Sequence, residues 1–448
     1  MKKQFIFTLA VCAFLAGCSS GKQAGDTSPT APSDGKAPRT TAEKQEPKLS
    51  PVTIKLFNAA NTTQSTFEKY MKAPVEKKYP HITLELVPNV QGSTLAELIN
   101  GNQLPDMVYG KVNDTNKVMI DLAPLVAKFK FDLKTIKPRV LEYYKYLTGA
   151  SVTQFIPYQT NQHVLHYNKG IFDRFGVEYP KDGMTWDAAY ELARKMSRTD
   201  NGTKIMGFNF RQNLNFSDPQ LQVEYYDVKT GKSALNSTIW NRYFENYARF
   251  FKIPGNELTK GKSELNNDNV FIAEQRVAMY ASHPMLTNLM DANNSGNSID
   301  WDLASYPYFP EAPKQGTAPN TNGLGITVAS KHQDDAFRVI EALVSEEVQT
   351  LRAREIVAES VLVNDAKARA DLGKGTIVDK KNKAALFYNE YSPGRSPNPF
   401  NTYLSSYASQ AFVKVVEQGV DINTALREAD DLANKRIDEE IAKGTVKR

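Results

Sequence analysis

The sequence predicts an α/β protein built from two domains, and two observations support this. From Val52 onward, short segments with apolar residues at every second position alternate with segments whose apolar residues recur at helical spacing. The chain has 448 residues, and the roughly 400 that follow the polar N-terminal stretch exceed what one hydrophobic core usually organises. Apolar residues make up 41% of the chain, enough to build such cores.

The first predicted domain alternates strands with helices. Strands are predicted over 52–56, 82–86 and 104–109, where apolar residues alternate or follow a turn. In sheets of this kind, ligands bind beyond the carboxyl ends of the strands. The segments 58–62 and 109–111 are therefore expected to face a ligand.

Helix signals lie between these strands. Phe67, Tyr70 and Met71 share helical spacing, and Pro74 is expected to kink or end their helix. Thr94 and Glu97 have the spacing of a capping box at the start of the next helix, and a glycine at 101 suits its end.

A second region is expected to start near Phe155, with a strand over 164–167 and a helix over 171–175. Thr185 is predicted to cap a helix that begins at Trp186 and ends at Asn201-Gly202. We expect Trp186 and Trp301 to be core residues. A short strand over 325–329, a helix opened by Asp334 and an amphipathic helix from 421 onward complete the prediction.

The first 50 residues indicate export and anchoring. Lys2 and Lys3 precede an apolar run from 5 to 16, which is too short to span a membrane. Leu15-Ala16-Gly17-Cys18 resembles the bacterial lipobox, which implies that residues 1–17 are a signal peptide and that Cys18 carries a lipid. Residues 19–50 are polar, with Pro and Gly, and are predicted to form a disordered spacer.

Cysteine content, net charge and the absence of catalytic motifs argue against several classes of function for this chain. The two cysteines of the chain, Cys12 and Cys18, both lie in this N-terminal segment, so no disulfide is expected in the folded part. Net charge is +5 for the whole chain, and the charges are mixed along it, so nucleic acid is not an expected partner. We find no G-x-S-x-G, H-E-x-x-H or P-loop motif, and His163 and His166 are placed poorly for a shared metal. We therefore expect no enzyme, metal or cofactor, although a glycosidase carboxylate pair stays an open alternative.

An ordered series of motifs resembles one family, the maltose-binding type (family 1) of extracellular solute-binding proteins, the substrate receptors of ABC importers. In Phe271–Met279, Gln275 stands where the family usually has Gly. The motifs, in chain order, are Leu104-Pro105-Asp106-Met107-Val108, Ile156-Pro157-Tyr158 with Val164–Lys169, Tyr179–Asp187, Phe271–Met279, Trp301–Pro307 and Gly323–Ile326.

The resemblance implies two α/β lobes, each a mixed sheet flanked by helices, with a cleft that closes on the ligand by a hinge motion. It implies three crossings between the lobes, near 157–161, 318–322 and 357–363. The expected boundaries are 51–158 plus 322–360 for the N-terminal lobe and 159–321 plus 361–448 for the C-terminal lobe. The implied protein is a monomeric lipoprotein on the extracytoplasmic face of the cell membrane, which delivers its ligand to the importer's permease subunits.

A sugar receptor needs planar amides and carboxylates for hydroxyls, and aromatic faces for the rings. The candidate contacts lie at predicted strand ends, crossings and one polar loop, and Tyr109 is expected just past its strand, outside the core. These candidates are Asn58, Asn61, Tyr109, Gln159, Thr160, Asn161, Phe216, Asp218, His283 and Asn322. An oligosaccharide is the expected ligand, and a peptide, polyamine or metal complex is the alternative.

Overall fold

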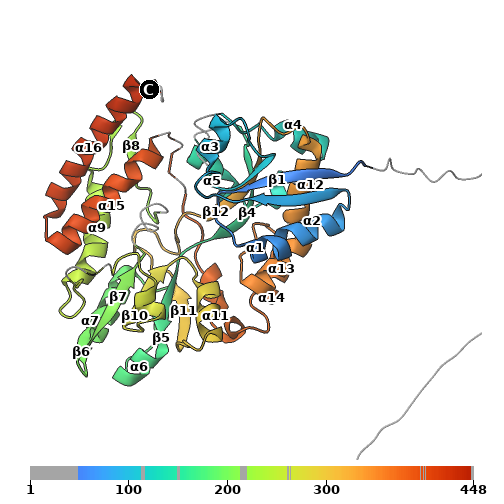
Figure 1. Ribbon diagram of the computed structural model, residues 1–448. Coiled ribbons are helices and arrows are strands. Elements are labelled where there is room, and N and C mark those ends of the chain that lie inside the picture. The colour runs from blue at the N-terminus through green and yellow to red at the C-terminus, as the bar shows by residue number, and fades with distance from the viewer. Residues whose placement is uncertain are drawn as a thin grey trace, which may run out of the picture. The chain divides into compact units, whose positions relative to one another are not determined.

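The computed structural model describes residues 49–111, 117–148, 152–211, 219–259, 262, 264–393, 395–396, 398 and 400–444. The predicted signal peptide, Cys18 and the spacer up to residue 48 lie outside this part of the chain, and so do Phe216 and Asp218. Within it, strands and helices alternate as an α/β fold with two separate sheets (Figure 1).

Most strands of the described residues belong to two five-stranded sheets, in the orders β2-β1-β3-β12-β4 and β11-β5-β10-β7-β6. We call the part built on the first sheet the first lobe and the part built on the second sheet the second lobe. The strands are β1 Val52–Asn58, β2 Ile82–Val87, β3 Met107–Gly110, β4 Phe155–Asn161, β5 Val164–Asn168, β6 Arg198–Asp200, β7 Thr203–Phe210, β8 Tyr226–Asp227, β9 Lys232–Ser233, β10 Val277–Ser282, β11 Trp301–Ser305 and β12 Asn320–Ile326.

The first sheet is mixed. β1 pairs in parallel with β2 and β3, whereas β12 runs antiparallel to both β3 and β4. This arrangement brings the carboxyl ends of β1, β3 and β4 to one edge, together with the start of β12. Asn58, Gly110, Asn161 and Asn320 mark that edge.

The second sheet follows the same plan. β7 and β10 are parallel, and β5 runs antiparallel to β10 and to β11. The ends of β7, β10 and β11 therefore share an edge with the start of β5, where Ser282 and Ser305 both pair with Val164.

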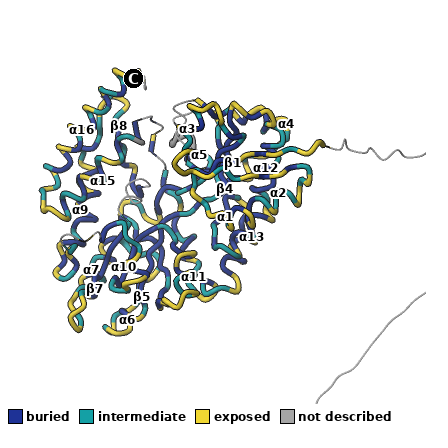
Figure 2. Tube along the Cα trace, in the orientation of Figure 1, coloured by how far each residue is buried: buried dark blue, intermediate teal, exposed yellow. Residues whose placement is uncertain are grey.

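Helices flank both sheets, and their outward faces carry most of the exposed residues (Figure 2). The helical elements are α1 Gln64–Phe67, the π-helical η1 Glu68–Lys72, α2 Ala73–Lys78, α3 Leu95–Asn100, α4 Ala123–Lys128, η2 Leu133–Thr135, α5 Pro138–Thr148, α6 Lys169–Phe175, α7 Trp186–Met196, α9 Thr238–Ala248, η3 Arg249–Lys252, α10 Asn269–Ile272, α11 Leu286–Asn294, α12 Gln333–Leu343, α13 Glu346–Ile356, α14 Ala366–Asp371, η4 Ile377–Lys380, η5 Lys383–Phe387, α15 Asn401–Gln418 and α16 Ile422–Ala442.

Two predicted caps are confirmed. The Thr94 hydroxyl accepts from the Glu97 backbone N–H and the Glu97 carboxylate accepts from the Thr94 backbone N–H, which is a complete capping box at the start of α3. The Thr185 hydroxyl caps α7 by accepting from the Ala188 N–H.

Pro74 does not end its helix, so that part of the prediction is wrong. The chain stays helical from Gln64 to Lys78, and the π-helical turn η1 directly precedes the proline. The Ala73 N–H bonds the Glu68 carbonyl, five residues back. Pro74 then occupies the first turn of α2, where a missing N–H carries no penalty.

Asn201-Gly202 is also not a helix end. α7 ends at Met196, and Asn201-Gly202 instead forms the two-residue turn between β6 and β7. Both turn residues have positive φ, 48° and 78°, as a type I′ hairpin turn requires. Asn-Gly between two short extended segments was the signal for this hairpin.

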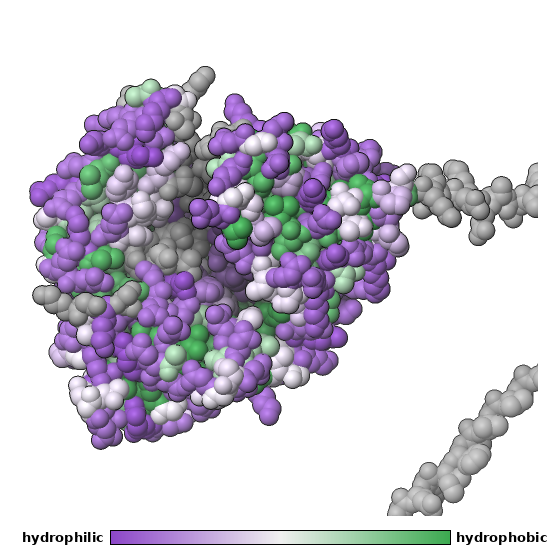
Figure 3. Space-filling view, in the orientation of Figure 1, coloured by the Kyte–Doolittle hydropathy of each residue, from purple (hydrophilic) through white to green (hydrophobic). Residues whose placement is uncertain are grey.

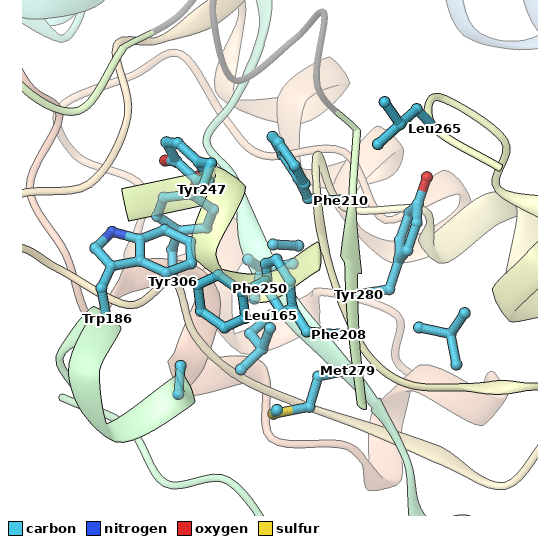
Figure 4. Packing of buried hydrophobic residues seen from close by; sticks show 14 of the residues in the cluster. Leu165, Trp186, Phe208, Phe210, Tyr247, Phe250, Leu265, Met279, Tyr280 and Tyr306 are labelled. Carbon is cyan, nitrogen blue, oxygen red and sulfur yellow. The ribbon is translucent and has the colours of Figure 1, made fainter. Parts of the chain in front are cut away.

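The two lobes have separate hydrophobic cores. The second lobe's core is rich in aromatic rings, several of which surround Trp186 (Figure 4). Ring centroids of Tyr247 and Tyr306 lie 5.0 and 5.1 Å from that of Trp186. The predictions that Trp186 and Trp301 are core residues are confirmed, since each is 1% exposed. The first lobe's core is mainly aliphatic and covers both faces of its sheet.

Candidate functional site

The two sheet edges described above come close to each other where the chain passes between them, since Asn161 on the first edge and Pro284 just beyond β10 line one cavity. β4 ends at Asn161 on the edge of the first sheet, and β5 starts at Val164 on the edge of the second. Only Gln162 and His163 separate the two strands. We call these the facing edges. The molecular surface is hollowed between the side that carries α9, α15 and α16 and the side that carries α3 and α5 (Figure 3).

On the edge of the first lobe, Asn58 closes the loop that follows β1. Its side-chain amide donates to the Thr62 carbonyl at 2.8 Å, and its oxygen accepts from the Thr62 N–H at 2.9 Å. Asn58 is 5% exposed, whereas Asn61 is exposed and has a φ of 54°. Asn58 therefore shapes this loop, and Asn61 presents its side chain outward from it.

Tyr109 does not lie past its strand, and the prediction that it sits outside the core is wrong. It is inside β3, is 3% exposed and belongs to the first lobe's core. Its ring packs edge-on against Tyr158, with centroids 5.5 Å apart, and its hydroxyl donates to Gln159 Oε1 at 3.0 Å. The strand continues to Gly110, which the predicted strand over 104–109 left out.

Gly110 is needed where β3 reaches the edge. Its φ is 139°, and a Cβ at this position would lie 2.7 Å from the Ala60 backbone nitrogen. The next residue, Lys111, donates from Nζ to Asn320 Oδ1 at 2.5 Å, so it joins the ends of β3 and β12. Sequence reasoning placed segment 109–111 at the edge but did not single out this lysine.

Asn322, a predicted contact, is half-buried at an irregularity in the β12–β4 pairing.

On the edge of the second lobe, a charged cluster stands at the ends of β7 and β10. Arg211 forms an ion pair with Asp268, and the Tyr280 hydroxyl donates to the same carboxylate at 2.9 Å. His283 lies beside them, with Nδ1 at 3.0 Å from the Ser282 hydroxyl. Burial lowers the pKa of His283, so its imidazole is neutral at pH 7. His283 was predicted, but Arg211 and Asp268 were missed, although Arg211 directly follows a strand.

The predicted residues Gln159, Thr160 and Asn161 line a cavity of about 210 Å³, which we call the crossing cavity. It also includes Glu359 in segment 357–363, where Glu359 pairs with Thr160 of β4 through an isolated bridge. The full lining is Thr66, Gln159, Thr160, Asn161, Pro284, Leu286, Thr287, Arg352, Ile356, Val357, Ala358, Glu359 and Leu386.

Apart from Tyr109, the predicted residues that the structure describes lie along these edges and the adjoining cavity, with Asn161 belonging to both. Asn58, Asn61, His283 and Asn322 lie on the facing edges, and residues 159–161 line the crossing cavity. A larger cavity of about 720 Å³, between α9 and the α15–α16 turn, contains none of the predicted residues. Within the described ranges, no three His, Cys, Asp or Glu side chains are grouped to hold a metal.

Comparisons with known proteins agree with this architecture. Residues 59–350 match the family described as bacterial extracellular solute-binding protein. The curated sn-glycerol-3-phosphate-binding periplasmic protein UgpB of Brucella abortus (strain 2308) is 24% identical over 223 residues, which are 47% of this chain and 48% of the relative. The chain therefore spans about half the length of the curated relatives it matches.

Solved structures share the whole fold. The ABC substrate-binding protein Lmo0181 from Listeria monocytogenes, in complex with cycloalternan, has a TM-score of 0.71 at 20% identity, over 87% of this chain and 99% of the other. The sugar-binding protein MalE from Xanthomonas citri has a TM-score of 0.70 at 16% identity, over 89% and 100%. These similarities confirm the predicted two-lobed periplasmic-binding-protein fold.

The predicted family is also confirmed, since the match covers more than half of the chain. No helix among the described residues has the length and apolar composition needed to cross a membrane. The chain belongs to the family of bacterial extracellular solute-binding proteins.

Proposed function

We propose that this protein captures a sugar or oligosaccharide between its two lobes and delivers it to an ABC importer. The observation that supports this proposal most directly is the pair of facing edges. Both carry hydrogen-bonding side chains, and a link of only two residues joins β4 to β5. A solute held there would contact both lobes at once, and lobe closure is a change of shape that a permease can recognise.

The side chains at these edges suit hydroxyl groups. Asn61 and Asn322 supply planar amides on the first lobe, while Asp268 supplies a carboxylate on the second. Arg211 and Tyr280 already hold that carboxylate in place, so it would lose little side-chain freedom on accepting a ligand hydroxyl. We propose His283, Phe216 and Asp218 as further contacts, the last two of which lie outside the described residues.

The relatives support a polyhydroxylated solute. Similar folds have been solved with cycloalternan and with α-D-tagatose, the latter in a solute-binding protein from Thermotoga lettingae. A second candidate is a phosphorylated polyol. It is favoured by Lys111 and Arg211, which place one cation on each facing edge, and by the curated relative that binds sn-glycerol 3-phosphate.

A thermal-shift screen of sugars, oligosaccharides and glycerol 3-phosphate tests the ligand class. At 100 times its dissociation constant, a ligand adds about 2.7 kcal/mol to the free energy of unfolding. The ligand should be recovered unchanged after incubation, because the proposal is a receptor and not a glycan-cleaving enzyme. A screen in which only peptides, polyamines or metal complexes shift the melting temperature would contradict the proposal.

We further propose that the receptor is monomeric and that Cys18 anchors it to the outer face of the cell membrane. The supporting observation is Leu15-Ala16-Gly17-Cys18 behind a short apolar run. Cys18→Ser should release the protein from the membrane fraction into the medium or periplasm. A Ser variant that still sediments completely with membranes would contradict the anchor.

A further inference from the structure

A cation and an anion meet in the cluster at the ends of β7 and β10. Arg211 is the first residue after β7, and its backbone N–H bonds the Ala281 carbonyl of β10 at 3.0 Å, so it lies at the facing edge of the second lobe. Its guanidinium donates from Nη1 to Asp268 Oδ2. The Tyr280 hydroxyl donates to the other oxygen, Asp268 Oδ1, at 2.9 Å. The charge of Arg211 is thus compensated by a carboxylate that the cluster holds in place.

This ion pair is open to solvent in part. The side chain of Arg211 is 28% exposed and that of Asp268 is 16% exposed. The neighbouring imidazole of His283 is neutral at pH 7, because burial lowers its pKa. Asp268 raises that pKa and Arg211 lowers it, so the two charges oppose each other at the imidazole. A solute that reaches this edge therefore meets a compensated pair and a neutral ring.

The two ligand classes proposed above differ in charge. A phosphate group beside an uncompensated arginine gains charge-assisted hydrogen bonds and Coulomb attraction. Beside the pair of Arg211 and Asp268, the attraction of a phosphate to the guanidinium is opposed by repulsion from the carboxylate. A sugar hydroxyl carries no charge and can both donate and accept hydrogen bonds. The pair therefore favours a neutral solute over a phosphorylated one.

We propose that Asp268 is a specificity-determining residue of this receptor, which selects neutral polyhydroxylated solutes by compensating the charge of Arg211. The inference rests on the proposed capture of a solute between the lobes, and it narrows the ligand class. Lys111 lies on the first lobe, where it bonds Asn320, and a substitution at Asp268 leaves that contact in place. A change in charge preference caused by such a substitution therefore belongs to the second lobe.

Calorimetry of the purified full chain with sn-glycerol 3-phosphate tests this role, with glycerol as the uncharged probe of the same skeleton. Asp268→Asn keeps an oxygen that can accept from Tyr280 but removes the carboxylate charge. Its affinity for glycerol 3-phosphate should rise by about tenfold or more over the wild type, whereas its affinity for glycerol should not rise. The gain should shrink between about 50 and 500 mM NaCl, because salt screens the attraction. No gain, or a gain that salt does not change, would overturn the proposal.

Glu274→Gln is the matched control. Glu274 is an exposed carboxylate paired with Arg276, and it precedes β10 at the end of the strand away from the facing edge. This substitution changes the net charge of the chain by the same amount, so its affinity for glycerol 3-phosphate should equal that of the wild type. Adding Arg211→Gln to Asp268→Asn should abolish the gain. A double variant that keeps the gain would refute the role of Arg211.

This specificity can fail independently of the proposed function. Binding of a sugar by the wild type reports on solute capture, whereas the gain in Asp268→Asn reports on the charge preference. A wild type that binds sugars, together with an Asp268→Asn variant that shows no gain, would overturn only the specificity. If Asp268→Asn fails to fold, the wild type decides the question. It should bind glycerol 3-phosphate no more tightly than glycerol, and tighter binding of the phosphate would overturn the proposal.

Discussion

The two lobes share a sheet plan but differ in what fills their cores. In the second lobe, Trp186 packs against Tyr247, Tyr306, Phe208 and Phe250, with centroid separations of 5.0 to 6.0 Å. Their polar atoms are paired inside the core: the Tyr247 and Tyr306 hydroxyls lie 3.0 Å apart, and Trp186 Nε1 donates to Gln220 Oε1. The first lobe relies on aliphatic residues on both sheet faces.

This difference changes how the aromatic content should be interpreted. The chain contains 21 Tyr, 22 Phe and 3 Trp. If the protein binds a sugar, these rings are candidates to stack on the faces of the sugar. Many of these rings instead build the second lobe's core. Aromatic abundance therefore does not locate the ligand, and the proposed ligand site rests on the hydrogen-bonding residues at strand ends.

Trp186→Ala should have the largest effect, because it removes the centre of the aromatic core. We expect a loss of about 3–5 kcal/mol in the free energy of unfolding, measured by urea denaturation. Trp186→Phe keeps an aromatic ring but removes the N–H that donates to Gln220 Oε1. We therefore expect this variant to lose about 1–3 kcal/mol of the free energy of unfolding. Equal losses in both variants would mean that the ring packing is not what matters.

Tyr109→Ala tests the core of the first lobe. Because Tyr109 is buried inside β3 and packs against Tyr158, we expect a loss of about 3 kcal/mol. Tyr109→Phe removes only the hydrogen bond to Gln159 and should lose about 1 kcal/mol. If Tyr109→Ala kept wild-type stability but bound the ligand more weakly, Tyr109 would be a ligand contact and not a core residue.

The link between the lobes should respond to pH through Glu359. Its pKa is raised from its ordinary value of 4.5 to about 7 in the folded chain, so the folded state holds this proton more tightly than the unfolded state. Stability from this group is therefore full below about pH 4.5, falls as pH rises through 7 and stays low above it. Relative to Glu359→Gln, wild type should lose about 2–3 kcal/mol between pH 4.5 and 8. Parallel pH profiles for the two proteins would contradict the raised pKa.

Gly202→Ala should have the smallest effect, confined to the β6–β7 hairpin at the rim of the second sheet. A Cβ there meets no atom within 4 Å, so only the positive φ of 78° opposes it. We expect a loss of about 1 kcal/mol in the free energy of unfolding, measured by urea denaturation. Gly207→Ala is the contrasting change, since its Cβ would lie 2.1 Å from the Ala193 carbonyl oxygen. A larger loss for Gly202→Ala than for Gly207→Ala would contradict the packing of α7 on β7.

The sequence predicted local structure correctly where the deciding residues are close to one another in the chain. The Thr94–Glu97 capping box, the Thr185 cap and the strand over 82–86 depend on neighbouring residues, and all are found. Pro74 does not end its helix as one form of the prediction had it, because a π-helical turn precedes it and the proline occupies the first turn of α2. Asn201-Gly202 was misjudged because the same pair suits a helix end and a hairpin turn.

The site was harder to predict because it depends on contacts between distant residues. Lys111 reaches Asn320, Arg211 reaches Asp268, and Glu359 meets Thr160 across long sequence separations. Strand alternation predicts where strands end, but it does not show which ends meet. It also predicted that Tyr109 lies just past the end of its strand. Because β3 continues to Gly110, Tyr109 is a core residue and was wrongly predicted to face the cleft.

Hydrogen–deuterium exchange with and without a sugar identified by the screen tests the central claim most directly. If the solute is captured between the lobes, protection should rise at both facing edges together, over 58–62 and 109–111 in the first lobe and 282–285 in the second. The outer helices α2 and α7 should be unaffected. Protection at saturating sugar that is confined to one lobe, or absent from both edges, would contradict capture between the lobes.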